Sequence, residues 1–300
     1  MSIQQLRYVV AAVKNKSNVQ AANSVIVSPQ AISKAISATE RRFGKQLFDR
    51  TDGQRTPTEF ALSFASKAES IVNEYDDLTA MADTLSETTS VQGDITIALA
   101  ATPFRGETFD AKLLDQFVEQ NPLVRLSLTQ LSSESCIHAT SMQIVDGAIV
   151  PGRIMHTDLD CIRIGRQSMS VIAHHMHPLG DKKRLSLSEL ACFKIAFPSN
   201  LYTIYPIVER CFKQANLPLP SFSHIPPDAS SAIEFLKEGG LIMSGPNNPL
   251  LLLDVDLKEI RLDTQSAIII PICLINSKNN DKAALKGLKT FLYQKAPRLR

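Results

Sequence analysis

Apolar and polar positions alternate at helical spacing in the first part of the chain. Between residues 3 and 16, apolar side chains recur every three or four positions at Leu6, Val9, Val10 and Val13, which predicts one buried helix face. The pattern predicts a second, short helix over residues 18–25 and a third over residues 29–42. Short helices joined by a tight turn, with a polar face on the second of the pair, predict a helix-turn-helix.

The third predicted helix has one apolar and one polar face. Ser28 is placed to cap it, and Pro29 suits its first position. Ile32 and Ile36 are four residues apart, so both are expected to face the core. The positions left outside are Gln30, Ser33, Lys34 and Ser37. A polar face with one cation suits the floor of a DNA major groove.

A small wing is predicted after this helix. Asp52-Gly53 is a strong signal for a tight turn between two strands, and Arg50 and Arg55 flank it. We expect these two arginines to contact the DNA backbone or the minor groove.

DNA binding needs phosphate contacts for affinity and base contacts for sequence choice. Gln30, Ser33 and Lys34 are the candidates for base reading, since Gln suits adenine and Lys suits guanine. The alternative is that some of them are only solvated or reach phosphates. Ser28, at the helix start, is expected to bring backbone N–H groups to a phosphate.

Residues 58–87 predict a long helix with an unbroken apolar heptad seam. The seam residues are Ala61, Phe64, Ala68, Ile71, Tyr75, Leu78, Ala82 and Leu85. Such a seam is typical of two helices wound around each other, although a helix buried within one domain shows a similar stripe. Seven anions between residues 58 and 92 favour a solvated dimerisation helix.

Short apolar strands alternate with helical segments after a polar linker over residues 87–93. Strands are predicted at 95–100, 124–131, 147–150, 162–164, 169–173, 194–197, 241–243 and 267–275. Helices are predicted at 109–120, 186–191, 205–215, 230–237 and 282–293. This alternation predicts α/β units around largely parallel sheets.

Charge is distributed unevenly along the 300 residues. Residues 1–57 hold nine cations and three anions, whereas residues 58–92 hold one cation and seven anions. The basic head is therefore the part expected to meet polyanionic phosphates. The length allows two or three domains, and contents of 44% hydrophobic and 21% charged residues are ordinary for a globular protein.

The compartment is expected to be cytoplasmic. The five cysteines are widely spaced without a Cys-x-x-Cys pair, which favours a reducing environment and argues against a disulfide framework or a structural zinc site. We expect no secretory signal at Met1-Ser-Ile-Gln-Gln and no membrane-spanning segment.

His174-His175-Met176-His177 raises the question of a metal site. Adjacent histidines on a strand point to opposite faces, and no Cys or acidic residue is spaced nearby as in usual sites. We therefore expect a loop histidine cluster, with no metal and no cofactor. No catalytic residue is expected either, because the hydrolase, metalloprotease, P-loop and dinucleotide motifs are all missing.

One set of residues in the first ninety positions follows a family pattern. It consists of Leu6, Val10, Ala21-Ala22, Val27-Ser-Pro-Gln-Ala-Ile-Ser33, Ile36, Glu40, Phe43-Gly44, Leu47-Phe48, Arg50 and Thr56-Pro-Thr58. In this order and spacing they resemble the LysR-type transcriptional regulators. Glu238-Gly-Gly-Leu-Ile-Met-Ser-Gly-Pro246 is similar to that family's glycine-rich turn into a buried strand. The sequence departs from the family pattern at Asn18, where an aromatic is common, and at Thr58-Glu-Phe-Ala, where the family usually has Thr-x-Ala-Gly.

The resemblance implies an α+β multidomain fold. It places a winged helix-turn-helix at 1–58, a linker (dimerisation) helix at 59–88, a hinge at 89–92 and a two-lobed α/β effector-binding domain, similar to periplasmic binding proteins, at 93–300. Lobe one would be about 93–156 plus 266–300, and lobe two about 157–265. The implied partners are double-stranded promoter DNA, a small-molecule effector, a second copy of the chain in a dimer or a homotetramer, and RNA polymerase.

Polar residues that follow predicted strands are the candidates for effector binding, because α/β folds bind ligands at the carboxyl ends of strands. They are Thr102, Arg105, Ser132, Ser199, Asn200, Thr203 and Ser244. They would suit a carboxylate or another polar metabolite, although ordinary loop residues are a strong alternative. The sequence thus predicts a metabolite-responsive transcriptional regulator. A transport receptor is disfavoured by the basic head, and an enzyme by the missing catalytic constellation.

Overall fold

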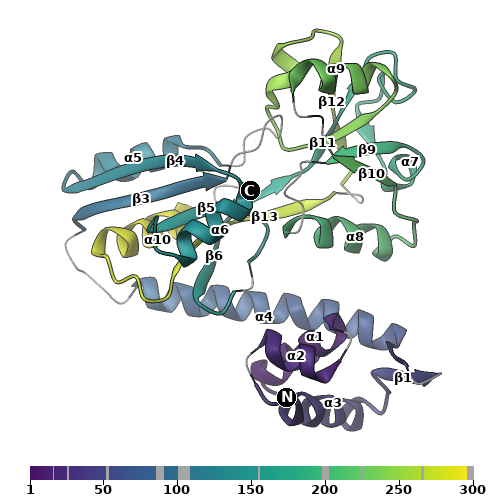
Figure 1. The fold of residues 1–300 in the computed structure, drawn as a ribbon, viewed down its shortest axis with the longest axis vertical. Helices are drawn as coiled ribbons and strands as arrows, with labels where there is room; N and C mark the ends of the chain where they lie inside the picture. The colour runs from purple at the N-terminus through teal and green to yellow at the C-terminus, as the bar shows by residue number, and fades with distance from the viewer. Residues whose placement is uncertain are drawn as a thin grey trace. The chain divides into compact units, whose positions relative to one another are not determined.

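In the computed structural model the chain divides into two units, Met1–Ser86 and Glu87–Arg300 (Figure 1). The structure describes residues 1–15, 17–25, 27–51, 54–85, 91–100, 109–154, 156–197, 203–224, 226, 228–264 and 267–295. Within these ranges only the backbone is described at residues 50, 51, 54, 55, 77 and 80–85. None of the helices in these ranges is long and apolar enough to cross a lipid bilayer.

Three helices and a hairpin form the head of the first unit. The helices are α1 (Ile3–Lys14), α2 (Asn18–Ser24) and α3 (Pro29–Phe43), and the antiparallel hairpin is β1 (Phe48–Thr51) with β2 (Gln54–Pro57). Ser2, Ser17 and Ser28 each cap a helix, accepting a hydrogen bond from the backbone N–H three residues on. The predicted helix-turn-helix and wing are confirmed.

The long helix α4 (Glu59–Leu85) completes the core of the first unit. Its Ala68 and Val72 pack against Leu6 and Val10 of α1, and Ala61 joins the core of the head. The expectation of one continuous dimerisation seam is therefore wrong in its first half, where small alanines let α1 approach closely. Farther along, Ile71, Tyr75 and Leu78 are 52%, 47% and 56% exposed. We call these three residues the α4 stripe.

Two ion pairs strengthen the contact between α1 and α4. Lys14 Nζ lies 2.6 Å from Glu69 Oε1, and Arg7 pairs with Asp76. Two cations of the basic head are thus matched by anions of the acidic stretch, so the anions of α4 are not all solvated as the sequence had indicated.

A five-stranded sheet forms the first lobe of the second unit. Its strands are β3 (Gly93–Ala100), β4 (Val124–Leu131), β5 (Gly147–Pro151), β6 (Leu159–Ser168) and β13 (Ile269–Ser277), in the order β4-β3-β5-β13-β6. The helices α5 (Lys112–Gln120) and α10 (Ala283–Lys295) contact each other, and the ring centroids of Phe117 and Phe291 are 5.5 Å apart. Helix α6 (Ser133–Ser141) packs through Cys136 and Ala139 into a separate cluster with β3, β5 and β13.

A six-stranded sheet forms the second lobe. Its strands are β7 (Ser170–His174), β8 (Arg184–Leu185), β9 (Lys194–Phe197), β10 (Ser221–His224), β11 (Leu241–Ser244) and β12 (Leu257–Leu262), in the order β10-β9-β11-β7-β12-β8. Its helices are α7 (Leu187–Leu190), α8 (Tyr205–Gln214), α9 (Ala229–Lys237) and the 3-10 helix η2 (Pro249–Leu252). Helices α8 and α9 lie on opposite faces of the sheet (Figure 1).

Two details of the sequence prediction are corrected. The sheets are mixed rather than largely parallel, because β13 runs antiparallel to β5 and β6, and β7 antiparallel to β11 and β12. The lobe boundary expected near Thr157 lies instead near Met169, because β6 pairs along its length with β13. Strands β8, β10 and β12 have no counterpart in the prediction, since they are short or only partly apolar.

Two chain segments cross between the lobes, one after β6 and one before β13. They are joined where the Met169 N–H donates to the carbonyl oxygen of Ile268 at 2.9 Å. Beside them, Gly152 has a φ of +85°, and a Cβ there would lie 2.6 Å from the carbonyl oxygen of Thr203. Both the backbone conformation and the space therefore require glycine.

The tight contact at Gly152 predicts a large stability loss for Gly152→Ala. Backbone strain alone costs about 1–3 kcal/mol, and the clash with Thr203 adds to it. Gly239→Ala is the matched control, because Gly239 has a φ of +86° but nothing within 4 Å of the place that a Cβ would occupy. Urea unfolding of the full-length protein followed by circular dichroism should show the larger loss for Gly152→Ala, and equal losses would contradict the assignment.

Candidate functional site

The outer face of α3 carries the predicted DNA-reading residues. Gln30, Ser33 and Lys34 are all exposed, whereas Ile32 and Ile36 are buried in the head's core. Ser28 Oγ accepts from the Ala31 N–H at 3.3 Å, which holds the first turn of α3 in place. Because Pro29 has no N–H and the Ala31 N–H is donated to Ser28, the first turn offers an anion the Gln30 N–H and the positive end of the helix dipole.

A side-chain hydrogen bond joins α2 to α3 on this face. Asn18 Nδ2 donates to Ser33 Oγ at 2.8 Å. The sequence had marked Asn18 only as a departure from an aromatic position. In the structure Asn18 holds the hydroxyl of Ser33, one of the residues predicted to read bases.

Two side chains hold the loop between α3 and the wing, one from α3 and one from the residue that follows β2. Glu40 Oε1 accepts from the Leu47 N–H at 2.8 Å, and Thr58 Oγ1 donates to the Gln46 carbonyl at 2.9 Å. In the hairpin, Arg50 and Arg55 are directly paired across the two strands, so their Cα atoms share one position along the wing. Their side chains, and the turn at Asp52-Gly53, lie outside the described residues.

The residues predicted to bind the effector follow strands of the two sheets in the sequence. In the first lobe β3 is parallel to β4 and β5, and in the second β9 is parallel to β10 and β11, so each set of strands ends at one edge of its sheet. Four of the predicted residues lie outside the described residues, namely Thr102, Arg105, Ser199 and Asn200. The remaining three are Ser132, Thr203 and Ser244.

Ser132 caps α6 at the carboxyl end of β4. Its Oγ accepts from the Ser135 N–H at 3.1 Å, and the residue is half-buried. The start of α6 therefore faces the edge where the sequence predicted a ligand, with its cap already formed.

Thr203 and Ser244 are buried and held by neighbouring groups. Thr203 Oγ1 donates to the Pro151 carbonyl at 2.9 Å, which links the two lobes. Ser244 Oγ accepts from Asn248 Nδ2 at 2.7 Å and donates to the Gly245 carbonyl, also at 2.7 Å. The described contacts thus give both hydroxyls a structural part in shaping the loops around the edge.

The cysteines and the third histidine of the cluster lie in different surroundings. Cys136 and Cys273 are buried, Cys192 is exposed, and burial raises the pKa of the Cys211 thiol. Burial also lowers the pKa of His177, whose ring packs 4.7 Å from that of Phe193. His177 Nδ1 accepts from the Leu179 N–H at 3.0 Å, so this histidine is part of the turn that follows β7.

Two family models match this chain. The model of the LysR substrate binding domain matches residues 90–296, and that of the bacterial regulatory helix-turn-helix protein, lysR family, matches residues 3–62. The chain belongs to the LysR family. It is a sequence-specific DNA-binding transcriptional regulator with a domain for a small-molecule effector, as the sequence predicted.

Two relatives are similar to this chain over most of their length. The chain is 23% identical to a probable RuBisCO transcriptional regulator of Thalassiosira pseudonana, covering 97% of this chain and 95% of that protein. It is 21% identical to the HTH-type transcriptional regulator YybE of Bacillus subtilis, covering 80% of each.

Solved structures share the fold. The full-length structure of BenM matches with a TM-score of 0.55 and 18% identity, covering 98% of this chain and 96% of that one. The LysR family regulator CbnR matches with a TM-score of 0.53 and 18% identity, covering 97% of this chain and all of that one.

The buried hydrogen bond of Thr203 predicts a stability effect without any ligand. Thr203→Val keeps the side-chain shape but removes the donor to Pro151, so the free energy of unfolding should fall by about 1 kcal/mol. Thr203→Ser keeps the donor and serves as the control. Thermal unfolding of the ligand-free protein checks this, and an unchanged midpoint for Thr203→Val would show that the hydroxyl has no structural part.

Proposed function

We propose that α3 lies in the major groove of promoter DNA and that Gln30, Ser33 and Lys34 face the base edges. The observation that carries this proposal is their exposure on one side of α3 while the other side is buried in the head. A helix of this kind fits the major groove by width, and these side-chain types match base-edge donors and acceptors. A solved structure of full-length CbnR with its target DNA has the same fold as this chain (TM-score 0.54), which supports the same use of the head here.

The flanking contacts in this proposal go to the DNA backbone. Ser28 and the first turn of α3 bind one phosphate, because the Gln30 N–H and the positive end of the helix dipole favour an anion there. Arg50 and Arg55 of the wing reach the backbone or the minor groove. These contacts supply affinity and register, while the α3 face supplies sequence choice.

The second part of the proposal is that the α4 stripe pairs two chains. Ile71, Tyr75 and Leu78 recur at spacings of four and three residues and are about half exposed, which is typical of a helix that packs against another helix. A pair of chains presents two copies of α3 to one DNA site, with a spacing set by the dimer. Association of two such dimers into a tetramer follows the family resemblance.

The third part concerns the effector. We infer that Ser132, Thr102, Arg105, Ser199 and Asn200 line the ligand site, because each follows the carboxyl end of a strand. A carboxylate or another polar metabolite suits their hydroxyl, amide and guanidinium groups. Thr203 and Ser244 shape this edge through their buried hydrogen bonds.

The remaining partners follow from the regulator's role. We propose that the protein works in the cytoplasm without catalysing a reaction, and that RNA polymerase is the partner through which it changes transcription. The five cysteines without a Cys-x-x-Cys pair fit a reducing compartment.

Lys34→Ala tests the assignment of α3. A lost base contact should weaken binding to sites found by genome-wide mapping by about 1–3 kcal/mol, or roughly 5- to 150-fold. A lost phosphate contact should instead reduce the salt dependence, with the slope of log K falling by about 0.9. Fluorescence anisotropy at several salt concentrations separates the two.

The matched control for this variant is Lys67→Ala, which removes an exposed cation from α4 of the same unit. It should leave specific affinity nearly unchanged. Equal affinity of the wild type and Lys34→Ala at every salt concentration would remove Lys34 from the interface.

Leu78→Asp tests the α4 stripe. Burial of one leucine side chain is worth about 1.5–3 kcal/mol, so the dimer dissociation constant should rise at least about tenfold. Leu62→Asp is the control, because Leu62 is 54% exposed on α4 but lies away from the stripe. Sedimentation velocity gives the dimer dissociation constant of each variant. An equal rise of that constant in both variants would contradict pairing through the α4 stripe.

A further inference from the structure

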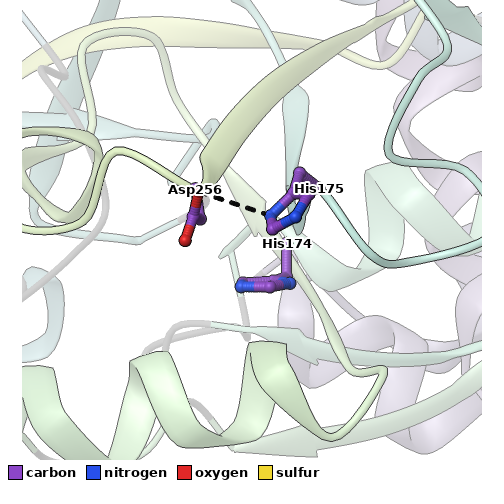
Figure 2. A group of neighbouring side chains, drawn as sticks. All are labelled: His174, His175 and Asp256. Carbon is purple, nitrogen blue, oxygen red and sulfur yellow. Dashed lines mark ion pairs between the residues drawn. The ribbon is translucent and has the colours of Figure 1, made fainter.

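The structure brings together three side chains that the sequence did not connect. His174, His175 and Asp256 lie in the second lobe, and their potential ligand atoms are all within 4.8 Å of one another (Figure 2). The expectation that the two adjacent histidines point to opposite faces is wrong. Strand β7 ends at His174, and His175 lies in the turn that follows. The alternation of a strand therefore stops at His174, and the two ring centroids are 4.5 Å apart.

Backbone contacts hold the acidic partner in place. The His175 N–H donates to the carbonyl oxygen of Asp256 at 2.8 Å, and Leu257 pairs with His174 in the ladder between β12 and β7. Asp256 is 81 residues away in sequence from His175, so spacing along the chain could not reveal it. In turn, the Asp256 N–H donates to Asp254 Oδ1 at 2.9 Å.

His175 Nδ1 is the group that points to a ligand. This nitrogen is buried and has no hydrogen-bond partner among the described residues, and it faces Asp256 Oδ1 at 3.5 Å. That separation is long for a hydrogen bond. It is close to the edge of a tetrahedral zinc site, about 3.4 Å between ligand atoms for Zn–N and Zn–O bonds of about 2.0–2.2 Å.

We propose that His174, His175 and Asp256 bind one divalent transition-metal ion of the zinc type. Two imidazoles and one carboxylate form a typical zinc donor set, with a fourth position left for water. Asp256 is half-exposed and gives the ion a path from solvent. Movements of at most about 1.4 Å bring the ligand atoms to tetrahedral spacing.

Metal binding changes one existing contact. His174 Nδ1 accepts from the Met176 N–H at 3.2 Å, so Nε2 is the nitrogen left for the metal. A neutral ring bound through Nε2 carries its proton on Nδ1, and the contact with Met176 is given up.

This site is separate from the predicted effector site. Ser170 at the start of β7 pairs with Ser244, whose strand ends at the effector edge, while His174 ends β7 four residues later. Four residues of strand span about 13 Å. The ion would link the end of β7 to the residue before β12, on the side of the sheet opposite the strand ends where the effector is predicted to bind.

Titration of the full-length protein with Co²⁺ and Zn²⁺ tests the proposal. We expect one Co²⁺ per chain with the visible absorption of a tetrahedral site, and loss of that absorption when Zn²⁺ is added. His175→Gln and Asp256→Asn should each weaken Zn²⁺ binding by at least the ~10–100-fold seen for supporting residues of metal sites. A chromophoric chelator in competition measures the affinities.

His224→Gln is the matched control, because His224 is an exposed histidine of the same sheet outside the cluster. It should keep the wild-type affinity, and circular dichroism should show that all three variants are folded. A Zn²⁺-dependent rise in Tm that is present in the wild type and His224→Gln, and missing in the other two, would support the site. Zn²⁺ affinity that is unchanged in both cluster variants, or no bound Zn²⁺ in the wild type, would overturn it.

Discussion

The effector domain depends on the hydrogen-bonded pair of crossing segments between its two sheets. The chain leaves the five-stranded sheet after β6 and returns to it at β13, and Met169 and Ile268 join the two crossings. Next to them the Gly152 N–H donates to the Pro271 carbonyl at 2.8 Å. Because no other strand among the described residues passes between the sheets, a change in the angle between the lobes must be absorbed by these few residues. The loops at the carboxyl ends of the strands therefore belong to two lobes that can move relative to each other in only a few ways.

The helix α4 serves two packing surfaces, and this division shapes the first unit. Its alanines and Val72 are used within the unit, where α1 lies close and two ion pairs add to the contact. The half-exposed residues Ile71, Tyr75 and Leu78 are left over for another surface. A substitution on the face that packs against α1 therefore affects the folding of the head. A substitution in the α4 stripe affects only the binding of a partner at that surface.

Much of this arrangement follows from the sequence because local signals agree with one another. Helix caps, the Asp-Gly turn and apolar periodicity fix the head from residues only a few positions apart. Pairing between distant segments is not encoded in this way. The lobe boundary differs from the predicted one because β13 returns antiparallel beside β6. Asp256 comes close to His175 because β12 pairs with β7. The first half of the heptad seam is used within the unit for a similar reason, since periodicity shows that a helix face is buried but not which partner buries it.

The hydrogen bond from Asn18 determines what Ser33 can offer to a base. A serine hydroxyl has one proton and two lone pairs, and Asn18 Nδ2 already occupies one lone pair. The hydroxyl proton is thus directed away from Asn18, so in the proposed complex with DNA Ser33 would act mainly as a donor. Its partners in that complex would be acceptor edges, such as guanine N7 and O6 or thymine O4, rather than the amino groups of cytosine and adenine. A residue on the neighbouring helix, which need not touch DNA, would then bias the sequence that the regulator selects.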